Sequence, residues 1–324
     1  MRSWRPLGYS PKDRKHYIEK QKVGSSEPLQ NRKINKVYVE LPKTGLGNKL
    51  LVWAKGMVFS KINKLPLVTS TWWGLHWGAL LRRGNKSRLY LGYFKETSIA
   101  KRMVIKWELL LRRIVRDPEV TLVQTETQQS TIFLFHKVIT NEDLFFELRQ
   151  HRELISGELY GMLTPRMHTQ LAGYATPVVG VHIRRGDFKL GNQTTPLDYF
   201  MNAIKLIRQT RNEEMPVTIF TDADPSEISE ILALPGITIA ASKPDILDIL
   251  LLSKSKIMIL SKSSTFGYWA AFLSDALVVR PHYDWQEKLR DNNPSLNYQE
   301  IKWDFTNNKS VEDFKEAICR AKIN

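Results

Sequence analysis

The sequence of 324 residues contains a single cysteine, Cys319. One thiol cannot build a disulfide framework within the chain, and it excludes a zinc site made of several cysteines. The sequence also lacks an apolar run of about 18 residues, the length that a bilayer-spanning helix needs. Its first residues have no apolar stretch of the secretory type. We therefore expect a cytoplasmic protein without a membrane-spanning helix or a secretory leader.

Acidic residues are outnumbered: 33 Asp and Glu stand against 48 Lys and Arg, which gives a net charge of +15. Such an excess favours nucleic acid, acidic membrane surfaces or phosphorylated substrates as partners. Residues 1–36 hold ten Lys or Arg against three acidic residues, and we interpret them as a basic N-terminal arm. The arm is either a solvated tail or a peripheral contact with an anionic inner membrane surface, where each near-surface cation contributes about 1 kcal/mol.

The length and the hydrophobic content of 42% suit two domains with cores of their own. In the second half, short Val- and Ile-rich runs alternate with segments of helical periodicity. Strands are predicted at 177–184, 216–221, 236–240, 255–260 and 276–280, and helices near 197–211, 225–233, 245–253 and 267–274. This alternation favours parallel strands joined by right-handed helical crossovers.

The first half is less regular. We predict strands at 36–41 and 66–69, a helix over 49–63, a helix with a basic face over 98–116 and another over 141–164. The domains are then an acceptor-side domain over 37–170, a Rossmann-like domain over 171–300 and a C-terminal helical tail over 301–324. The tail helix is expected to return to the first domain.

The strand-like run at 178–183 ends abruptly in Arg184, Arg185, a glycine and Asp187. Residues of a strand alternate faces, so His182 and Arg184 share the face opposite the apolar one. Ligands of open α/β sheets lie beyond the carboxyl ends of the strands, and a guanidinium fork there suits a phosphate or diphosphate. The pattern predicts an anionic substrate. The alternative is a structural ion pair of Arg184 or Arg185 with Asp187 or Asp222.

Two further strands end in polar groups. The strand at 216–221 is followed by Asp222, whose carboxylate suits the paired N–H groups of a guanine. Asp222 and Asp224 alternatively form a turn or an Asp-x-Asp metal clamp. After the strand at 255–260, small hydroxyl residues open a helix, whose free N–H groups favour phosphate; an ordinary N-cap is the alternative. These residues are Ser263, Ser264 and Thr265. The three strand ends together predict a nucleotide pocket.

The first half adds two weaker features. A Gly-Leu-Gly-Asn block at 45–48 lacks the third glycine of the dinucleotide fingerprint. Its Asn48 is suited to donate a hydrogen bond to a diphosphate or sugar, or else it caps a tight turn. Trp72, Trp73 and Trp77 offer rings that stack on sugars, although aromatic residues are more often part of a core.

Taken together, these segments resemble the α-1,2-fucosyltransferases and, more broadly, the α-1,2/α-1,6/protein-O-fucosyltransferase superfamily. The resemblance rests on the block at 45–48, the His-Ile-Arg-Arg-Gly-Asp block at 182–187 and the Thr-Phe-Gly-Tyr-Trp-Ala-Ala block at 265–271. A Leu-Gly-Tyr-Phe segment at 91–94 is also similar. The coverage extends from about residue 37 to 282, and Lys49 departs from the glutamine that usually follows the asparagine.

The resemblance implies an α/β, GT-B-like fold with two Rossmann-like domains facing across a cleft. It implies a GDP-L-fucose donor, a glycan acceptor, inversion at the anomeric carbon, an α-1,2 linkage and no metal or other cofactor. Arg184 would grip the donor diphosphate, and Asp187 beside it is our candidate for the acceptor base. The implied donor-nucleotide contacts are His182, Arg185, Asp222, Ser263, Ser264, Thr265 and Asn48, and the tryptophans are weak candidates for the acceptor.

Two other functions stay open at this point. One is a different nucleotide-sugar-dependent transferase that binds a metal through Asp222 and Asp224. The other is a non-enzymatic basic protein that binds nucleic acid or a membrane, for which affinity should collapse with salt. The resemblance makes nucleic acid an unexpected partner. Whether the acceptor is free or lipid-linked also stays open.

Overall fold

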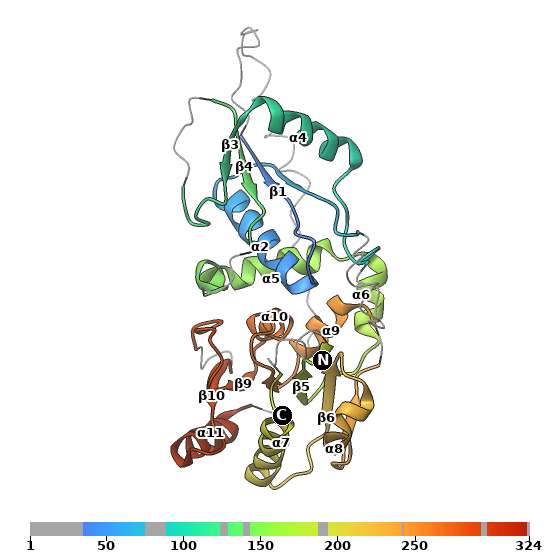
Figure 1. The fold of residues 1–324 in the computed structure, drawn as a ribbon, viewed down its shortest axis with the longest axis vertical. Coiled ribbons are helices and arrows are strands. Elements are labelled where there is room, and N and C mark those ends of the chain that lie inside the picture. Colours follow the sequence, from blue (N-terminus) through green and yellow to red (C-terminus); the bar gives the residue numbers. More distant parts are fainter. Residues whose placement is uncertain are drawn as a thin grey trace, which may run out of the picture. The chain divides into compact units, whose positions relative to one another are not determined.

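The computed structural model describes residues 35–74, 89–123, 129–138, 143–186, 194–241, 243–292 and 297–322. Residues 35–324 form one unit with two parallel sheets and helices on both faces of each (Figure 1). The predicted α/β class with two Rossmann-like parts is therefore confirmed. Residues 1–34 of the basic arm, Trp77 and Asp187 lie outside the described residues, and the boundaries of the predicted domains stay a prediction.

The first sheet has four parallel strands in the order β2-β1-β4-β3, namely β1 (Lys36–Val39), β2 (Leu67–Thr69), β3 (Arg113–Arg116) and β4 (Thr131–Phe135). Side chains alternate along these strands as the pleat requires. Val37 and Val39 join the core under α2 (Leu46–Ile62), whereas Tyr38 faces a smaller cluster under α4 (Ile99–Leu111). The helix predicted at 49–63 is confirmed as α2.

Two predictions in this half were wrong in detail. The helix predicted over 98–116 ends at Leu111, and β3 follows at once beside β4. The β-branched Ile114 and Val115 favour this extended pairing. The helix predicted over 141–164 is a short 3₁₀ helix, η2 (Phe146–His151), followed by α5 (Arg152–Met162). A further helix, α6 (Pro165–Ala172), begins with a proline, which suits a first helical turn.

The second sheet has six parallel strands in the order β10-β9-β8-β5-β6-β7. Its strands are β5 (Val179–Ile183), β6 (Val217–Thr221), β7 (Ile237–Ile239), β8 (Ile257–Leu260), β9 (Leu277–Pro281) and β10 (Gln299–Trp303). The chain runs outward from β5 to β7, returns to β8 on the other side of β5 and continues outward to β10. This is the order of dinucleotide-binding folds, in which the ligand binds at the point of reversal between β5 and β8. Five of these strands were predicted, and β10 was not.

Helices cover both faces of the second sheet: α7 (Leu197–Arg211), η4 (Pro225–Ile228), α8 (Ser229–Leu232), α9 (Asp245–Leu252), α10 (Thr265–Leu273) and α11 (Asn308–Arg320). The predicted alternation of β5 is confirmed, because Val179, Val181 and Ile183 share one core with α7 and α11. The tail helix was misplaced by the prediction, since Phe314 of α11 packs on Trp303 of β10 and not on the first sheet.

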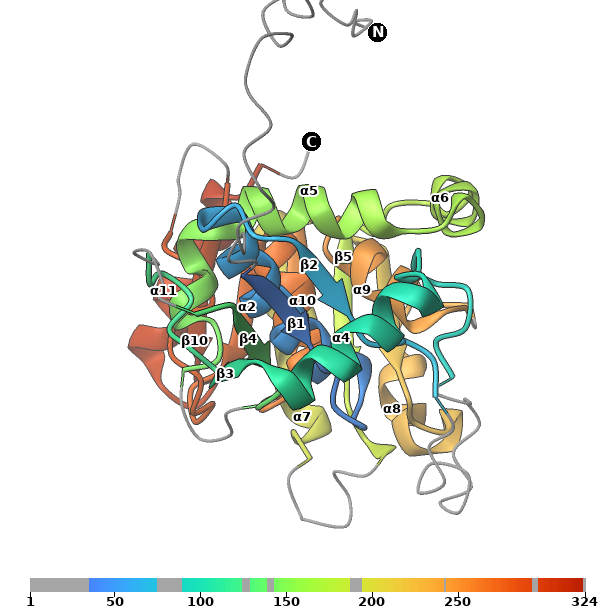
Figure 2. The same ribbon diagram turned by 90° about the horizontal axis from the view of Figure 1, so that it is seen from above.

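The other faces of the two sheets share a core. Helices α2 and α5 pack against α10 (Figures 1 and 2). Apolar side chains from both halves of the chain therefore lie in one cluster. Phe145 contributes to this cluster by packing on Trp269 and Phe272 of α10. Within the described segments, no helix combines the length and apolar character needed to cross a membrane.

Candidate functional site

The point of strand reversal lies where β5 and β8 end, and a single hydroxyl ties the two ends together. Ser261, just after β8, accepts a hydrogen bond from the backbone N–H of Arg184 at 2.9 Å through its Oγ. The same hydroxyl is 3.0 Å from the carbonyl oxygen of His182, to which it donates. The start of the polar segment after β5 is therefore fixed against its neighbour.

Arg184 is paired with the acid that follows β6. Its Nη1 lies 2.6 Å from Oδ2 of Asp222, and Oδ1 of the same carboxylate accepts the backbone N–H of Arg185 at 2.8 Å. Gly186 is required here, because a Cβ at that position would collide with the Asp222 carboxylate. The Arg184 side chain remains 19% exposed, so the ion pair orients the guanidinium without closing it inside a dry core.

The Arg185 side chain binds a different part of the chain. Its Nη1 donates to the carbonyl oxygen of Thr195 at 3.0 Å, and burial lowers the pKa of this guanidinium. The hydroxyl of Thr195 accepts the backbone N–H of Lys262 at 3.0 Å. Arg185 thus holds the segment before α7 to the turn after β8. The prediction missed Thr195, whose only sequence signal is its place just before the proline that starts α7.

His182 is buried and uncharged near neutral pH. Its ring stacks on Phe266 with centroids 5.2 Å apart, and Gly267 leaves room for it, since a Cβ there would lie 3.0 Å from Nδ1. Burial lowers the pKa of His182 to about 4, against a smaller opposing effect of Asp222. Its Nδ1 has no hydrogen-bond partner among the described residues. A neutral imidazole with a spare nitrogen therefore faces the first turn of α10.

The turn between β8 and α10 is held by hydrogen bonds from its backbone to two side chains. Ser263 has a left-handed backbone with φ of 55°, and its N–H points to the Tyr268 hydroxyl at 2.8 Å and to Oδ1 of Asp284 at 3.2 Å. Ser264 is the N-cap of α10, but its side chain makes no capping hydrogen bond. The N–H of Ser263 is therefore already engaged, which leaves the first turn of α10 from Thr265 as the better place for a phosphate.

A buried network supports this turn, and sequence reasoning missed it. The Tyr268 hydroxyl donates to Oδ1 of Asp284 at 2.5 Å, and Arg280 pairs with Oδ2 of the same carboxylate at 2.8 Å. Arg280 also pairs with Glu300 on β10. Burial and the neighbouring Asp284 raise the pKa of Tyr268, so its hydroxyl stays protonated. Asp284 follows the end of β9. An acidic residue after a strand end is the same sequence pattern that identified Asp222 as a candidate.

The Gly-Leu-Gly-Asn block of the first sheet meets this turn. The indole Nε1 of Trp269 donates to the carbonyl oxygen of Gly47 at 2.8 Å. A Cβ at Gly47 would lie only 2.6 Å from Oγ1 of Thr265, so only glycine permits this approach of α2 to α10. Asn48 lies half-buried in the same first turn of α2. The structure thus brings this block together with the Thr-Phe-Gly-Tyr-Trp-Ala-Ala block at 265–271.

Lys49 and Trp72 belong to the core of the first half. The Lys49 ammonium is 3.4 Å from the carbonyl oxygen of Trp72, and burial lowers its pKa. Trp72 is 2% exposed and packs on Phe94 with ring centroids 4.2 Å apart. The structure contradicts the suggested sugar-stacking role of Trp72, because its faces are covered. Trp73 is 47% exposed and stays a candidate.

The two acids of the suggested metal clamp point to different partners. Asp224 accepts the backbone N–H of Ser226 at 3.0 Å and forms a capping box with Glu227 at the start of η4. Asp222 is engaged by the two arginine segments, as described above. Among the described residues, no three His, Cys, Asp or Glu side chains gather closely enough to hold a metal ion.

A hollow also lies at the amino ends of the second sheet. Its lining includes Thr176, Ser255 and Asp275, which precede β5, β8 and β9. Because ligands of open α/β sheets bind beyond the carboxyl ends of the strands, we place the candidate site at Arg184 and not in this hollow.

Comparison with known families agrees with the assignment from the motifs. The model of Glycosyl transferase family 11 matches residues 104–293, more than half of the chain. The chain belongs to glycosyl transferase family 11. The resemblance to the fucosyltransferase family that the motifs indicated is therefore confirmed. The matched residues include the ends of β5, β6 and β8. No curated protein matches the chain.

Solved structures with a similar fold include three fucosyltransferases. The α-1,6-fucosyltransferase NodZ of Bradyrhizobium, soaked with GDP-fucose, is 14% identical with a TM-score of 0.48, over 84% of this chain and 96% of that one. FUT1 of Arabidopsis thaliana with GDP is 14% identical with a TM-score of 0.44, over 82% and 74%. POFUT1 in its apo form is 12% identical with a TM-score of 0.47, over 78% and 97%. Similarity this weak does not bear on what the family 11 chain binds.

Proposed function

We propose that this family 11 chain transfers L-fucose from GDP-L-fucose to a hydroxyl of a glycan acceptor, with inversion, with an α-1,2 linkage and without a metal ion. One observation carries the proposal: the Arg184 guanidinium stands at the strand reversal between β5 and β8, partly exposed and oriented by Asp222. The family match and the three motif blocks support the donor class.

The transfer is a substitution at C1 of the fucose. The acceptor oxygen forms the new bond, the bond from C1 to the β-phosphate oxygen breaks, and its electron pair leaves with GDP. The acceptor proton passes to a base, for which Asp187 stays the candidate. Negative charge grows on the departing diphosphate, and a preorganised donor aimed at such charge typically lowers the barrier by about 3–4 kcal/mol. Arg184 is the group placed to do so.

The neighbours of Arg184 have supporting roles in this proposal. A guanidinium carries five N–H donors, so one edge can bind Asp222 while another binds phosphate. The neutral His182 and the first turn of α10 add uncharged hydrogen-bonding groups, and His182 does so without repelling Arg184. Asn48 is our candidate for a donor contact from α2, because the preceding Gly47 lies against Thr265.

The engagement of the two aspartates favours the metal-independent mechanism over the clamp. One oxygen of Asp224 is used to cap η4, and both oxygens of Asp222 bind the arginine segments. A metal ion bound by both carboxylates would compete with the Arg184–Asp222 ion pair. Turnover that EDTA abolishes and Mn²⁺ or Mg²⁺ restores would contradict this part of the proposal.

The donor is tested with the purified full chain and a thermal-shift panel of GDP, UDP, CMP and ADP, each with and without EDTA. We expect selective stabilisation by GDP, about 2.7 kcal/mol at a concentration 100 times Kd, whether or not EDTA is present. Stronger stabilisation by another nucleotide would contradict the donor. Transfer from GDP-fucose but not from GDP-mannose, with NMR of the product, then tests the sugar, the linkage and the inversion.

A further inference from the structure

Helix α4 exposes a continuous apolar surface, which we call the α4 arc. Its residues are Ile99, Met103, Val104, Trp107, Leu110 and Leu111, each between 51% and 83% exposed. At 100° per residue, these six side chains cover about 140° of the helix circumference. Soluble monomers rarely expose apolar side chains that adjoin one another in this way. We therefore expect another surface to cover the arc.

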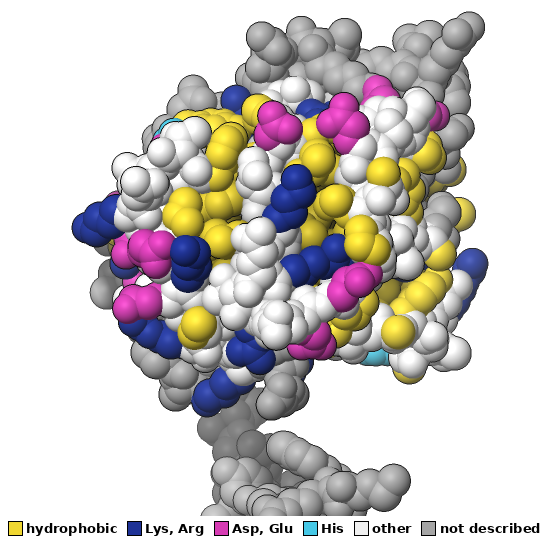
Figure 3. Space-filling model, turned by 90° about the horizontal axis from the view of Figure 1, so that it is seen from below, with side chains coloured by type: hydrophobic (Ala, Val, Ile, Leu, Met, Phe, Trp, Pro, Cys, Tyr) yellow, Lys and Arg dark blue, Asp and Glu magenta, His cyan; other side chains and the backbone are white. Residues whose placement is uncertain are grey.

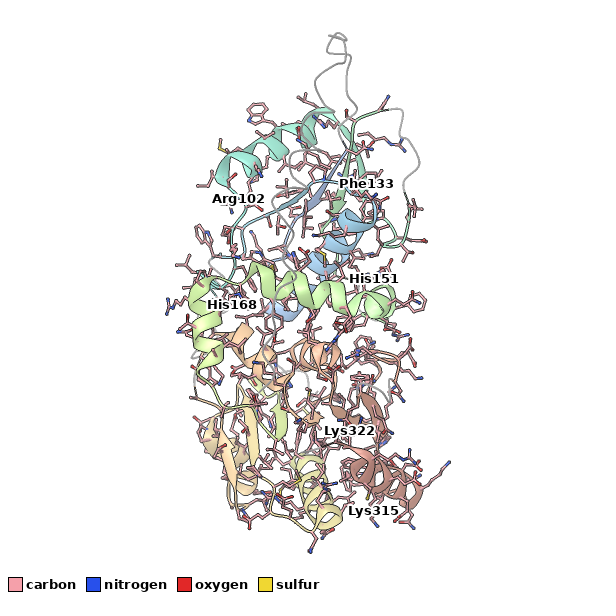
Figure 4. The ribbon with its side chains drawn as sticks, turned by 180° about the vertical axis from the view of Figure 1, so that it is seen from behind. Arg102, Phe133, His151, His168, Lys315 and Lys322 are labelled. Atoms are coloured by element: carbon pink, nitrogen blue, oxygen red, sulfur yellow. The ribbon has the colours of Figure 1, made fainter. Side chains whose placement is uncertain are left out.

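The arc is held outward by contacts on the other side of α4. Ile105 is the one fully buried residue of the helix, and it packs with Tyr38 and Ile132 on the first sheet. Glu108 binds the Lys36 ammonium of β1 at 2.7 Å and so ties the helix to the sheet. Some of the side chains drawn on α4, the helix on which Arg102 is labelled, project away from the strands in Figure 4. The sheet therefore uses one side of α4 and leaves the arc free.

Basic residues flank the arc. Lys101 and Lys106 lie on α4 at its two margins, and Arg116 follows on β3, on the same side of the sheet as Ile114 and α4; all three are exposed. Within the described part of the chain, none of the three is paired with an acid, whereas Arg102 and Arg112 are paired with glutamates. In contrast, acidic and basic side chains are interspersed on the face drawn in Figure 3. The surroundings of the arc thus combine apolar and positive character.

We infer that α4 docks on an anionic lipid bilayer, with the arc in the headgroup–acyl boundary and the three cations at the lipid phosphates. A helix with an apolar face that includes tryptophan and with basic margins is the type that lies in a membrane interface. The net charge of +15 complements such a surface. A second copy of the chain is the less suitable occupant, because an isologous contact would bring the same unpaired cations together.

The first experiment measures binding of the full chain to vesicles by flotation. Vesicles of phosphatidylcholine with phosphatidylglycerol should bind the protein, and pure phosphatidylcholine should bind it far less. Trp107→Ser and Leu110→Ser should each weaken binding about tenfold, because each removes a large apolar side chain from the lipid. Phe146→Ser is the matched control, since Phe146 is 70% exposed on η2, outside α4, and its loss should leave binding unchanged.

A second experiment locates the contact with an environment-sensitive dye. The single Cys319 is exposed on α11 and provides the control label. A Leu110→Cys substitution in a Cys319→Ser background provides the test label. Anionic vesicles should shift the emission at position 110 to the blue and leave that at position 319 unchanged. Equal responses at both positions would overturn the inference.

Other outcomes identify a different occupant. Vesicle binding that ignores both α4 substitutions and vanishes in high salt would assign it to the basic arm. A dimer in sedimentation equilibrium that Trp107→Ser dissociates would assign the arc to a second copy. Either result overturns the inference. Turnover on a soluble acceptor should be the same in the Ser variants and the wild type, so the test is independent of the proposed function.

Discussion

The two sheets differ in how completely their outer faces are covered. On the six-stranded sheet, α7 and α11 bury large side chains such as Tyr199 and Phe314 against the strands. On the four-stranded sheet, the outer cluster is small, and α4 buries only Ile105 fully while its arc stays exposed. The better-covered sheet carries the polar strand ends of the candidate site. The partly covered one offers a surface.

The two regions also differ in how their cations are held. At the carboxyl edge of the second sheet, Arg184 is held in one direction by Asp222. Around the α4 arc, the exposed cations Lys101, Lys106 and Arg116 have no acidic partner in the described segments. An oriented guanidinium suits one phosphate group in a defined position, whereas unpaired surface cations suit a diffuse negative surface. We therefore assign chemistry to the second sheet and attachment to the first.

The largest effect is expected at Arg184. Arg184→Lys should lower kcat with GDP-fucose by about 10²–10³-fold, because a point ammonium cannot bind Asp222 and a diphosphate through two separate edges. Steady-state kinetics measure this loss. Arg320→Lys on the exposed end of α11 is the matched control and should leave kcat unchanged. Near-wild-type turnover of Arg184→Lys would contradict the assignment of the chemistry to the second sheet.

The next effect concerns the support under the turn. Tyr268→Phe should lower the free energy of unfolding by about 1.5–3 kcal/mol, because it removes a buried hydrogen bond to the charged Asp284. GDP affinity should fall as well, since Ser263 loses one of its acceptors. Tyr199→Phe is the control, because the Tyr199 hydroxyl is buried without a partner among the described residues. Equal losses in the two variants would show that the network does not support the site.

The contact between the two halves is tested at Gly47. Gly47→Ala should cost about 1–3 kcal/mol of stability and weaken GDP binding, because its Cβ would collide with Oγ1 of Thr265. Gly45→Ala should change stability by less than about 0.5 kcal/mol, since no atom lies within 4 Å of a Cβ at Gly45. Chemical denaturation of both variants compares them. Tolerance of alanine at both positions would contradict the close approach of α2 and α10.

The smallest effect is a pH dependence from His182, which amounts to about 1.4 kcal/mol between pH 7.5 and pH 5.5. Its pKa is about 4 in the folded chain and about 6.5 unfolded, so the unfolded chain binds more protons between these values. The free energy of unfolding should therefore fall by about 1.4 kcal/mol per pH unit below about pH 6.5 and level off near pH 4. Denaturation of the wild type and His182→Phe at pH 7.5 and 5.5 isolates this contribution. A constant difference between the two would contradict the buried, neutral imidazole.

Much of the second sheet could be predicted from the sequence. The alternation at 178–183 identified both faces of β5, since the core of a parallel sheet buries strands of this kind completely. The helix α7 matches its prediction at both ends because apolar periodicity begins right after Pro196. In the first half, β4 contains an apolar run of four residues, 132–135, that the prediction overlooked. Strand β3 was hidden because its arginines continued the basic face of α4.

The directions of polar side chains could not be predicted to the same degree. Arg185 turns to Thr195, and Ser263 turns to Asp284, which lies 21 positions further along the chain. Such partners come from other strand ends, so only the folded topology brings them together. The Arg184–Asp222 pair was foreseen, but only as one of several pairings, because composition does not reveal which acid lies nearest.

The central claim is that Arg184 binds the donor diphosphate at the reversal between β5 and β8. A crystal structure of the chain with GDP in the presence of EDTA tests it most directly. The account predicts a guanidinium nitrogen of Arg184 about 3 Å from a β-phosphate oxygen, with that phosphate beside the first turn of α10. GDP bound elsewhere, or at this edge with Arg184 contacting Asp222 alone, would contradict the account.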